Sequence, residues 1–176
     1  MLTEYKIKRL KTMKQEKHLS MYGVGPIYGV VIIIVTIVAV IAGHTSIFDG
    51  GNINVLKVPS IILGILLIIF SVVIWYNALF RAKIDDGITG NNLITTGIYS
   101  FVRNPIYSAL MFICTGVLLI SGNVYFYLLF FFYWVFMTIL LKRTEEKWLK
   151  NLYGKEYEEY CRRVNRCIPW RAKKKF

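Results

Sequence analysis

Three long uncharged stretches dominate the pattern of apolar and polar positions along the chain. They run over residues 24–42, 58–80 and 104–141 and contain no Asp, Glu, Lys or Arg. The first two have 19 and 23 residues, close to the roughly 20 residues that cross a bilayer as a helix. Each of them therefore predicts one transmembrane helix.

The third stretch, with 38 residues, is too long for one crossing. Ser121, Gly122 and Asn123 interrupt it near its middle, which predicts a tight hairpin of two transmembrane helices over residues 105–120 and 124–141. Since a hairpin returns the chain to its starting face, Arg103 should lie near the Glu145–Glu146 pair.

The remaining segments are predicted to lie outside the membrane. Residues 1–22 have the pattern of a basic amphipathic juxtamembrane segment, and residues 142–176 that of cytosolic C-terminal helices and a tail. Gly154 is expected to separate a helix that continues from the last span and a short helix over residues 155–163. The apolar face of this short helix is predicted to consist of Tyr157, Tyr160, Cys161 and Val164. The predicted fold is thus all-α, a single polytopic membrane domain over residues 1–176 with four transmembrane helices.

Composition supports a membrane protein and predicts its orientation. The chain is 56% hydrophobic with a mean hydropathy of +0.50. Its net charge of +12 is concentrated before residue 24 and after residue 141, while the loop over residues 43–57 has a single Lys or Arg. Positive residues favour the cytoplasm, so both termini are predicted to be cytoplasmic. The basic residues lie beside spans and lack base-reading motifs, so anionic lipid is the expected partner and nucleic acid is not.

Two motifs carry the candidate chemistry, and each alone has a structural explanation. Asn104 is a good N-cap, Pro105 a good first helical residue, and Arg103 suits the headgroup region. Glu146 is spaced to pair with Lys150 on a water-facing helix. Together, however, the motifs predict a pocket of acidic and basic groups that opens toward the cytosol beside an apolar wall. Such a pocket suits a reaction between a polar cofactor and a lipid-embedded substrate.

The stretch LITTGIYSFVRNPIY (residues 93–107), the uncharged hairpin and the stretch TEEKWLKNLYGKEYEEYCRRVNRCIP (residues 144–169) resemble the isoprenylcysteine carboxyl methyltransferase and phospholipid methyltransferase superfamily. The family pattern is a Thr-Gly-x-Tyr turn, Arg-(His or Asn)-Pro-x-Tyr, a Glu-Glu pair, Gly-x-x-Tyr-x-x-Tyr and a closing Pro. The resemblance covers roughly the C-terminal half of the chain. It implies an integral membrane enzyme that uses S-adenosylmethionine, releases S-adenosylhomocysteine and requires no metal.

The resemblance also implies roles for individual residues. Those implied to bind the cofactor are Asn91, Leu93, Ile94, Gly97, Tyr99, Asn104, Pro105, Tyr107, Glu145 and Glu146. Those implied to act in catalysis are Arg103, Asn104, Tyr107 and Glu146, and those placed to hold an anionic acceptor are Lys142 and Arg143. Asn104 stands where many eukaryotic relatives have histidine, and an amide cannot carry a proton in catalysis.

Several alternatives stay open at this point. A nicotinamide-dependent reductase of sterol or polyprenyl double bonds resembles the same C-terminal region, and a non-catalytic membrane scaffold would use the motifs for folding alone. The acceptor is predicted to be lipid-borne or apolar, either an isoprenylcysteine-type carboxylate or a phospholipid amine. Gly25 and Gly29 suit close helix packing, either in a homodimer or within one chain. His18 and His44 are predicted on opposite sides of the membrane, which argues against a histidine metal site.

Overall fold

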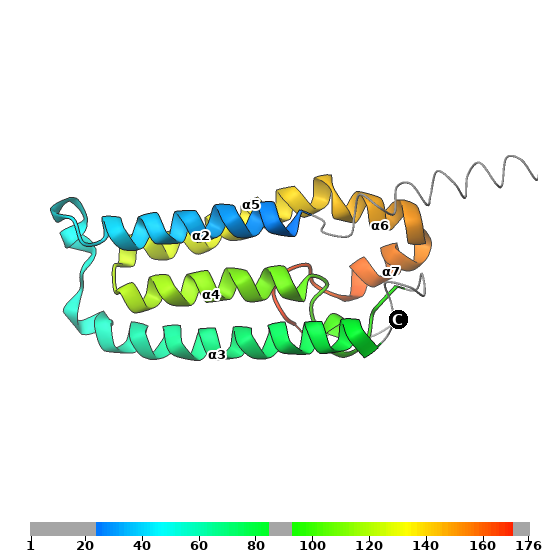
Figure 1. Ribbon diagram of the computed structural model, residues 1–176, viewed down its shortest axis with the longest axis horizontal. Coiled ribbons are helices and arrows are strands. Elements are labelled where there is room, and N and C mark those ends of the chain that lie inside the picture. Colours follow the sequence, from blue (N-terminus) through cyan, green and yellow to red (C-terminus); the bar gives the residue numbers. More distant parts are fainter. Residues whose placement is uncertain (1–23, 85–92, 171–176) are drawn as a thin grey trace, which may run out of the picture.

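A computed structural model describes residues 24–84 and 93–170, which form an elongated helical bundle (Figure 1). The described residues contain two isolated bridges and no β-strand, so the predicted all-α class is confirmed. The predicted basic segment over residues 1–22, His18 and the candidate residue Asn91 lie outside the described residues. The elements are α2 (Gly25–Ala42), η1 (Ser46–Gly51), α3 (Asn54–Ile84), η2 (Gly97–Ser100), α4 (Pro105–Ser121), η3 (Val124–Leu128), α5 (Leu129–Arg143), α6 (Glu145–Tyr153) and α7 (Lys155–Arg163).

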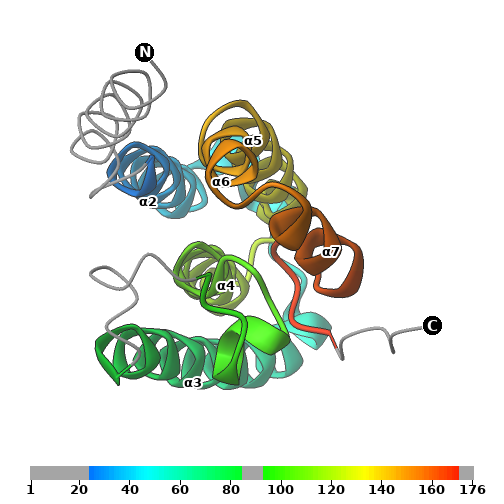
Figure 2. The same cartoon turned by 90° about the vertical axis from the view of Figure 1, so that its right-hand side faces the viewer.

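Helix α4 is the centre of the bundle. Helix α3 packs on one side of it, and α2 and α5 pack on the other (Figure 2). Nine of the 17 residues of α4 are buried, against five of 18 in α2. The outer helices carry exposed apolar side chains such as Ile34, Leu66 and Phe131. An apolar outer surface around a shielded central helix is the arrangement that a lipid environment requires.

Two glycines allow α3 and α4 to approach closely. A Cβ at Gly116 would lie 2.8 Å from the Gly64 carbonyl oxygen and 2.6 Å from Ile68 Cγ1. A Cβ at Gly64 would lie 2.6 Å from the Gly116 carbonyl oxygen. Since both carbonyls belong to helix backbones that cannot shift independently, any side chain at either position would push the two helices apart.

The predicted glycine pair of α2 also packs within the chain. A Cβ at Gly25 would meet the Tyr107 hydroxyl oxygen at 3.3 Å, and one at Gly29 would meet Leu110 Cδ2 at 3.1 Å. Both neighbours belong to α4, so the close packing that these glycines allow joins α2 to the central helix.

Three segments are long and apolar enough to cross a membrane, judged by length and composition. They are Gly25–Ala42, Asn54–Phe80 and Val124–Tyr153. Helix α4 is apolar but has 17 residues, and is therefore shorter than these three. The chain is thus an integral membrane protein with three candidate spans and a shorter central apolar helix.

The turn after α4 connects to the loop between α2 and α3. Gly122 ends α4 with φ +80°, a backbone conformation that glycine adopts without steric cost. Asn123 follows, is 1% exposed, and donates from Nδ2 to the Phe48 carbonyl at 2.8 Å. The backbone of Asn123 also forms an isolated bridge with Asn52. The end of α4 is therefore fixed to the same end of the bundle as the end of α2.

The structure corrects two predicted helix boundaries. Helix α3 begins at Asn54 and runs to Ile84, beyond both ends of the predicted span over residues 58–80, and Pro59 lies inside the helix. The last span does not continue as one uninterrupted helix, because Thr144 leaves helical geometry with φ −123° and ψ −88° between α5 and α6. The Thr144 hydroxyl donates to the Leu140 carbonyl at 2.6 Å, a local bond that competes with regular helix geometry. The predicted end at Gly154 and the helix over residues 155–163 are confirmed.

Candidate functional site

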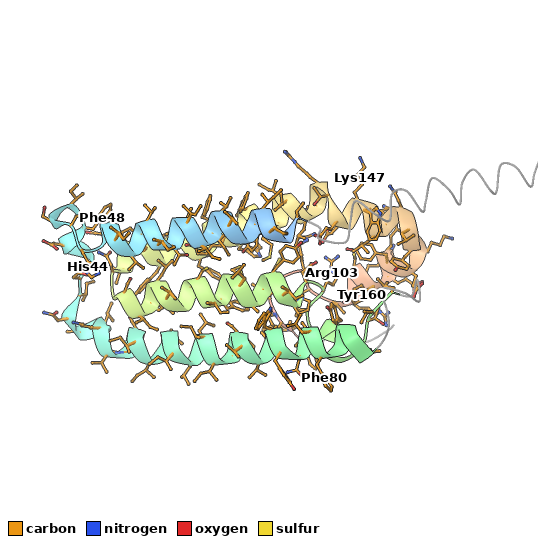
Figure 3. All side chains as sticks on the ribbon, in the orientation of Figure 1. His44, Phe48, Phe80, Arg103, Lys147 and Tyr160 are labelled. Carbon is orange, nitrogen blue, oxygen red and sulfur yellow. The ribbon has the colours of Figure 1, made fainter. Side chains whose placement is uncertain are left out.

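The candidate residues gather at the end of the bundle where α4 begins and α5 ends. Figure 3 shows Arg103, Lys147 and Tyr160 at this end, and His44 and Phe48 at the opposite end. The segment before α4, the first turn of α6 and the chain after α7 meet here. The predicted meeting of Arg103 with the glutamate pair therefore occurs, although it joins residues far apart in the sequence.

The two glutamates of the pair point into different surroundings. They are consecutive in the first turn of α6, and consecutive helical residues project about 100° apart. Glu145 Oε1 accepts a hydrogen bond from the Val24 backbone N–H at 2.9 Å and another from the Tyr107 hydroxyl. Glu145 thus joins the start of α2 to α4 and α6.

Glu146 instead pairs with two arginines. Arg166 binds it through two contacts, Nε to Oε1 at 2.5 Å and Nη2 to Oε2 at 2.9 Å. Arg103 Nη1 lies 3.2 Å from Oε1, and the Arg103 and Glu146 side chains are 7% and 14% exposed. The hydrogen bond to Glu146 raises the pKa of Arg166. The predicted Glu146–Lys150 pair is wrong, because Lys150 pairs with Glu158 at 2.7 Å.

The chain after α7 runs beside the start of α4 and is fixed to it by backbone contacts. We call residues 165–170 the C-terminal segment. The Arg103 N–H donates to the Asn165 carbonyl at 2.8 Å, and the Trp170 N–H donates to the Phe101 carbonyl at 3.1 Å. Asn104 donates to the Arg166 carbonyl from its backbone N–H at 3.2 Å and from Nδ2 at 3.1 Å. The expected N-cap role of the Asn104 side chain is therefore wrong, since its amide holds the C-terminal segment instead.

Helix α7 covers Arg103 from the other side. Arg103 Nη1 lies 3.4 Å from the Tyr157 hydroxyl, its Cζ lies 5.9 Å from the centre of the Tyr157 ring, and Nη1 also donates to Cys161 Sγ. Burial raises the pKa of Cys161, and the Arg103 guanidinium opposes that shift. Burial likewise raises the pKa of Tyr157. An arginine held between an aromatic ring and a carboxylate is restricted to one conformation.

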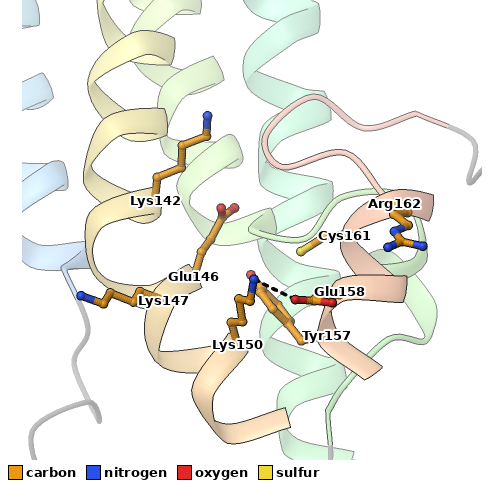
Figure 4. Close-up of a pocket in the computed structure, with 8 residues that line it drawn as sticks. All are labelled: Lys142, Glu146, Lys147, Lys150, Tyr157, Glu158, Cys161 and Arg162. Atoms are coloured by element: carbon orange, nitrogen blue, oxygen red, sulfur yellow. Dashed lines mark ion pairs between the residues drawn. The ribbon is translucent and has the colours of Figure 1, made fainter. Parts of the chain in front are cut away.

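A cavity of about 580 Å³ opens between α6 and α7 (Figure 4). Its lining residues are Lys142, Glu146, Lys147, Lys150, Tyr157, Glu158, Cys161 and Arg162. Both carboxylates of this cavity are already paired, Glu146 with the two arginines and Glu158 with Lys150. The Lys150–Glu158 hydrogen bond lowers the pKa of Glu158. The charge left uncompensated in the lining is therefore positive.

The other predicted residues surround the site or support it. Leu93 packs against the buried Tyr157, Tyr160 and Val164, and the Tyr99 carbonyl accepts a hydrogen bond from the Tyr160 hydroxyl at 2.6 Å. The remaining candidates are Gly97, which starts η2 with φ +60°, Ile94, which is half-buried, Pro105, which is buried at the start of α4, and Arg143, which is exposed. Among all the predicted site residues, Glu146 and Lys142 line the cavity.

Sequence reasoning missed Arg166, Tyr157 and Cys161 as members of the site. The sequence predicts Tyr157 and Cys161 only as members of the apolar face of the last helix, and that face is buried or half-buried. No local pattern assigns a role to Arg166, because its partner, Glu146, is 20 residues away on α6. The signal that could have found Arg166 is a basic residue directly before the closing Cys167-Ile168-Pro169 of the motif.

Comparisons with known proteins agree with this organisation. Residues 59–156 match the family described as phospholipid methyltransferase. A segment of 78 residues, 44% of this chain, is 36% identical to protein-S-isoprenylcysteine O-methyltransferase of Schizosaccharomyces pombe and covers 33% of that protein. The match therefore extends over about a third of the relative's length. No solved structure matches the chain.

Proposed function

The chain belongs to the phospholipid methyltransferase family, and from this premise we propose that it transfers a methyl group from S-adenosylmethionine to a lipid-borne or apolar acceptor. This proposal rests on one observation: Glu146, which is paired with Arg166, lines a cavity at one end of an apolar bundle. A water-soluble cofactor and a membrane substrate can both reach such a position. The basic residues after residue 141 favour the cytosolic face for it.

The residues of the cavity fit this cofactor chemically. A volume of about 580 Å³ lies within the range of roughly 300–1,000 Å³ that is common for small-molecule sites. Glu146 is a hydrogen-bond acceptor for ribose hydroxyls or an ammonium group, Lys142 and Lys147 are donors for a carboxylate, and the Tyr157 ring is a flat apolar wall. The lining therefore contains partners for the carboxylate of S-adenosylmethionine and for either its ammonium group or its ribose hydroxyls.

When bound, the cofactor supplies a methyl group already activated on a sulfonium. The protein then needs chiefly to align the acceptor and exclude water. Lys142, Lys147 and Arg162 have no ion-pair partner among the described residues, so the lining has more cations than the carboxylate of the cofactor needs, and this favours an anionic acceptor group. A carboxylate needs no proton removed before methylation, whereas a protonated amine does. Of the two predicted acceptor classes, the lipid-borne carboxylate is thus the one the cavity suits better.

We also propose that α4 is a fourth membrane crossing. With 17 residues and a rise of about 1.5 Å per residue, it is a little shorter than the hydrocarbon core. Its two ends nevertheless lie at opposite ends of the bundle, since Asn104 contacts Arg166 and Asn123 contacts Phe48. Because α2, α3 and α5 shield it from lipid, its length need not match the bilayer.

Calorimetry on the purified protein tests the cofactor. We expect heat of binding with S-adenosylhomocysteine and none with NADPH, and we expect Glu146→Gln to weaken binding about tenfold or more, since it removes a charged acceptor. Glu156→Gln is the matched control, because Glu156 is exposed on α7 and outside the cavity lining. Heat with NADPH alone would favour the reductase.

Transfer of a labelled methyl group into a lipid extract tests the acceptor. A methyl ester releases labelled methanol on mild alkaline treatment, whereas an N-methyl group stays bound. Alkali-labile label would support the carboxylate, and alkali-stable label would support the amine. No incorporation into any lipid, together with no cofactor binding, would favour the scaffold.

A further inference from the structure

The C-terminal segment contacts the start of α4 through groups other than the Arg166 side chain. The segment is fixed to the start of α4 by the carbonyls of Asn165 and Arg166 and by the N–H of Trp170. Cys167 is 2% exposed within the bundle core and anchors the segment further. The guanidinium of Arg166 takes no part in these contacts with the start of α4, and its hydrogen bonds to side chains go to Glu146 of α6.

The contacts around Glu146 leave one of its oxygens available. Oε1 faces two donors, Arg103 Nη1 and Arg166 Nε, while Oε2 accepts from Arg166 Nη2. Each carboxylate oxygen accepts about two hydrogen bonds, so Oε2 has room for one more donor. Glu146 is also one of the residues that line the cavity. A ligand hydroxyl or ammonium group would bind at Oε2.

A glutamate on a helix rotates about three side-chain bonds unless contacts fix it. Arg166 donates hydrogen bonds to both carboxylate oxygens of Glu146 from one planar guanidinium, whereas Arg103 contacts Oε1 alone. The two-point contact therefore determines the plane of the carboxylate and the direction in which Oε2 points.

We infer that Arg166 is a positioning residue, which holds the Glu146 carboxylate with Oε2 available to a ligand donor in the cavity. By this inference the C-terminal segment is part of the cofactor site, although no Arg166 atom lines the cavity. The inference rests on the proposed function for the identity of the ligand, and on the geometry around Glu146 for the role of Arg166.

Two variants at this position and one control variant separate positioning from folding. Arg166→Ala should bind S-adenosylhomocysteine about tenfold more weakly, because Glu146 loses its two-point contact. The affinity of Arg166→Lys for S-adenosylhomocysteine should lie between that of Arg166→Ala and that of the wild type. A lysine ammonium keeps the charge but cannot donate to both carboxylate oxygens in one plane. Arg163→Ala is the matched control, because Arg163 is an exposed arginine of α7 outside the site. Free guanidinium, but not sodium at equal ionic strength, should restore binding to Arg166→Ala.

Modification of Glu146 by a water-soluble carbodiimide gives a measure that needs no cofactor. Arg166→Ala should raise the rate of modification at Glu146, read by peptide mass spectrometry, and Arg163→Ala should leave it unchanged. If the wild type binds no S-adenosylhomocysteine, the proposed function fails while this measurement still reports on Arg166. Wild-type affinity together with an unchanged rate of modification in Arg166→Ala would overturn the inference. If Arg166→Ala fails to fold, the affinity for S-adenosylhomocysteine and the rate of modification at Glu146 are compared between Arg166→Lys and the wild type instead.

Discussion

Glu145 and Glu146 illustrate at the residue scale how neighbours in the chain acquire different roles. The sequence predicted cofactor contacts for both, because the family motif treats them as a pair. In the structure Glu145 accepts from the Val24 N–H and from the Tyr107 hydroxyl, away from the cavity lining. Glu146 alone of the two lines the cavity. Consecutive residues of an α-helix point about 100° apart, and this is enough to direct the two glutamates into different surroundings.

We therefore expect Glu145→Ala to reduce stability more than affinity. Its two donors would lose their acceptor, which costs about 1–3 kcal/mol for half-buried groups. Thermal unfolding in detergent should show the loss, while calorimetry on the folded variant should give nearly wild-type affinity for S-adenosylhomocysteine. Glu156→Ala, at an exposed position, should change neither measurement. A large loss of affinity with unchanged stability in Glu145→Ala would instead support the role predicted from the motif.

Cys161 offers a second test at this scale, because its thiol lines the cavity. Iodoacetamide reacts with the thiolate, and burial raises the pKa of Cys161 above its ordinary value. Less thiolate is present at neutral pH than for an ordinary cysteine, so the rate of alkylation should keep rising with pH through the ordinary thiol range and beyond it. S-adenosylhomocysteine should slow the reaction if it occupies the cavity.

Peptide mass spectrometry resolves the three cysteines in this experiment. Cys114 and Cys167 are 4% and 2% exposed, so they should react only after unfolding. A Cys161 rate that levels off by about pH 8, below the ordinary thiol pKa, would contradict the expected direction of the shift.

At the scale of elements, the uncharged stretches and the turn residues predicted most of the helices. The turn at Gly122, the end at Gly154 and the helix over residues 155–163 follow from local signals, and the structure confirms them. The break at Thr144 was not predicted, because apolar periodicity does not report where one helix changes direction. The pairing of Arg166 with Glu146 was not predicted either, since a contact between a helix and a segment 20 residues further along the chain leaves no local pattern.

The close contact of α3 and α4 gives a prediction for a single methyl group. Gly116→Ala should destabilise the protein by about 1–3 kcal/mol, because overpacking against a helix backbone cannot be relieved by rotating a side chain. The added Cβ would lie 2.8 Å from the Gly64 carbonyl oxygen. Thermal unfolding in detergent measures the effect.

Gly29→Ala is the matched control for this prediction. It adds the same methyl group to a helix, but its nearest neighbour is the end of the flexible Leu110 side chain at 3.1 Å. That side chain can shift, and alanine gains up to about 1 kcal/mol of helix propensity over glycine. Equal losses of stability in Gly116→Ala and Gly29→Ala would show that a methyl group at the Gly64–Gly116 contact destabilises the protein no more than one placed against a flexible side chain.

At the scale of the whole molecule, charge separates the two ends of the bundle. The end with the cavity carries Lys142, Arg143, Lys147, Lys150 and Arg162, whereas the other end has Lys57 in the first turns of α3. This asymmetry favours a cytosolic cavity. Whether α4 crosses the membrane determines the number of crossings between the loop after α2 and the end of α7. Labelling at these two places therefore tests both the orientation of the protein and the number of crossings.

Two exposed positions, Ile47 and Arg163, make this test possible. Ile47 is 82% exposed in the loop between α2 and α3, and Arg163 is exposed at the end of α7. Three crossings, α3, α4 and α5, separate them if α4 spans the membrane, and two if it does not. An odd number places the two residues on opposite sides.

In a Cys161→Ser background, we expect a membrane-impermeant maleimide to label Ile47→Cys in intact cells and Arg163→Cys only after permeabilisation. Labelling of both variants in intact cells, or of neither before permeabilisation, would mean an even number of crossings and would exclude α4 as a span. Labelling of Arg163→Cys alone in intact cells would keep four crossings but invert the orientation, which would place the cavity on the side away from cytosolic cofactor. An even number of crossings would contradict the placement of α4 across the bundle. An inverted orientation would contradict the prediction from the distribution of basic residues.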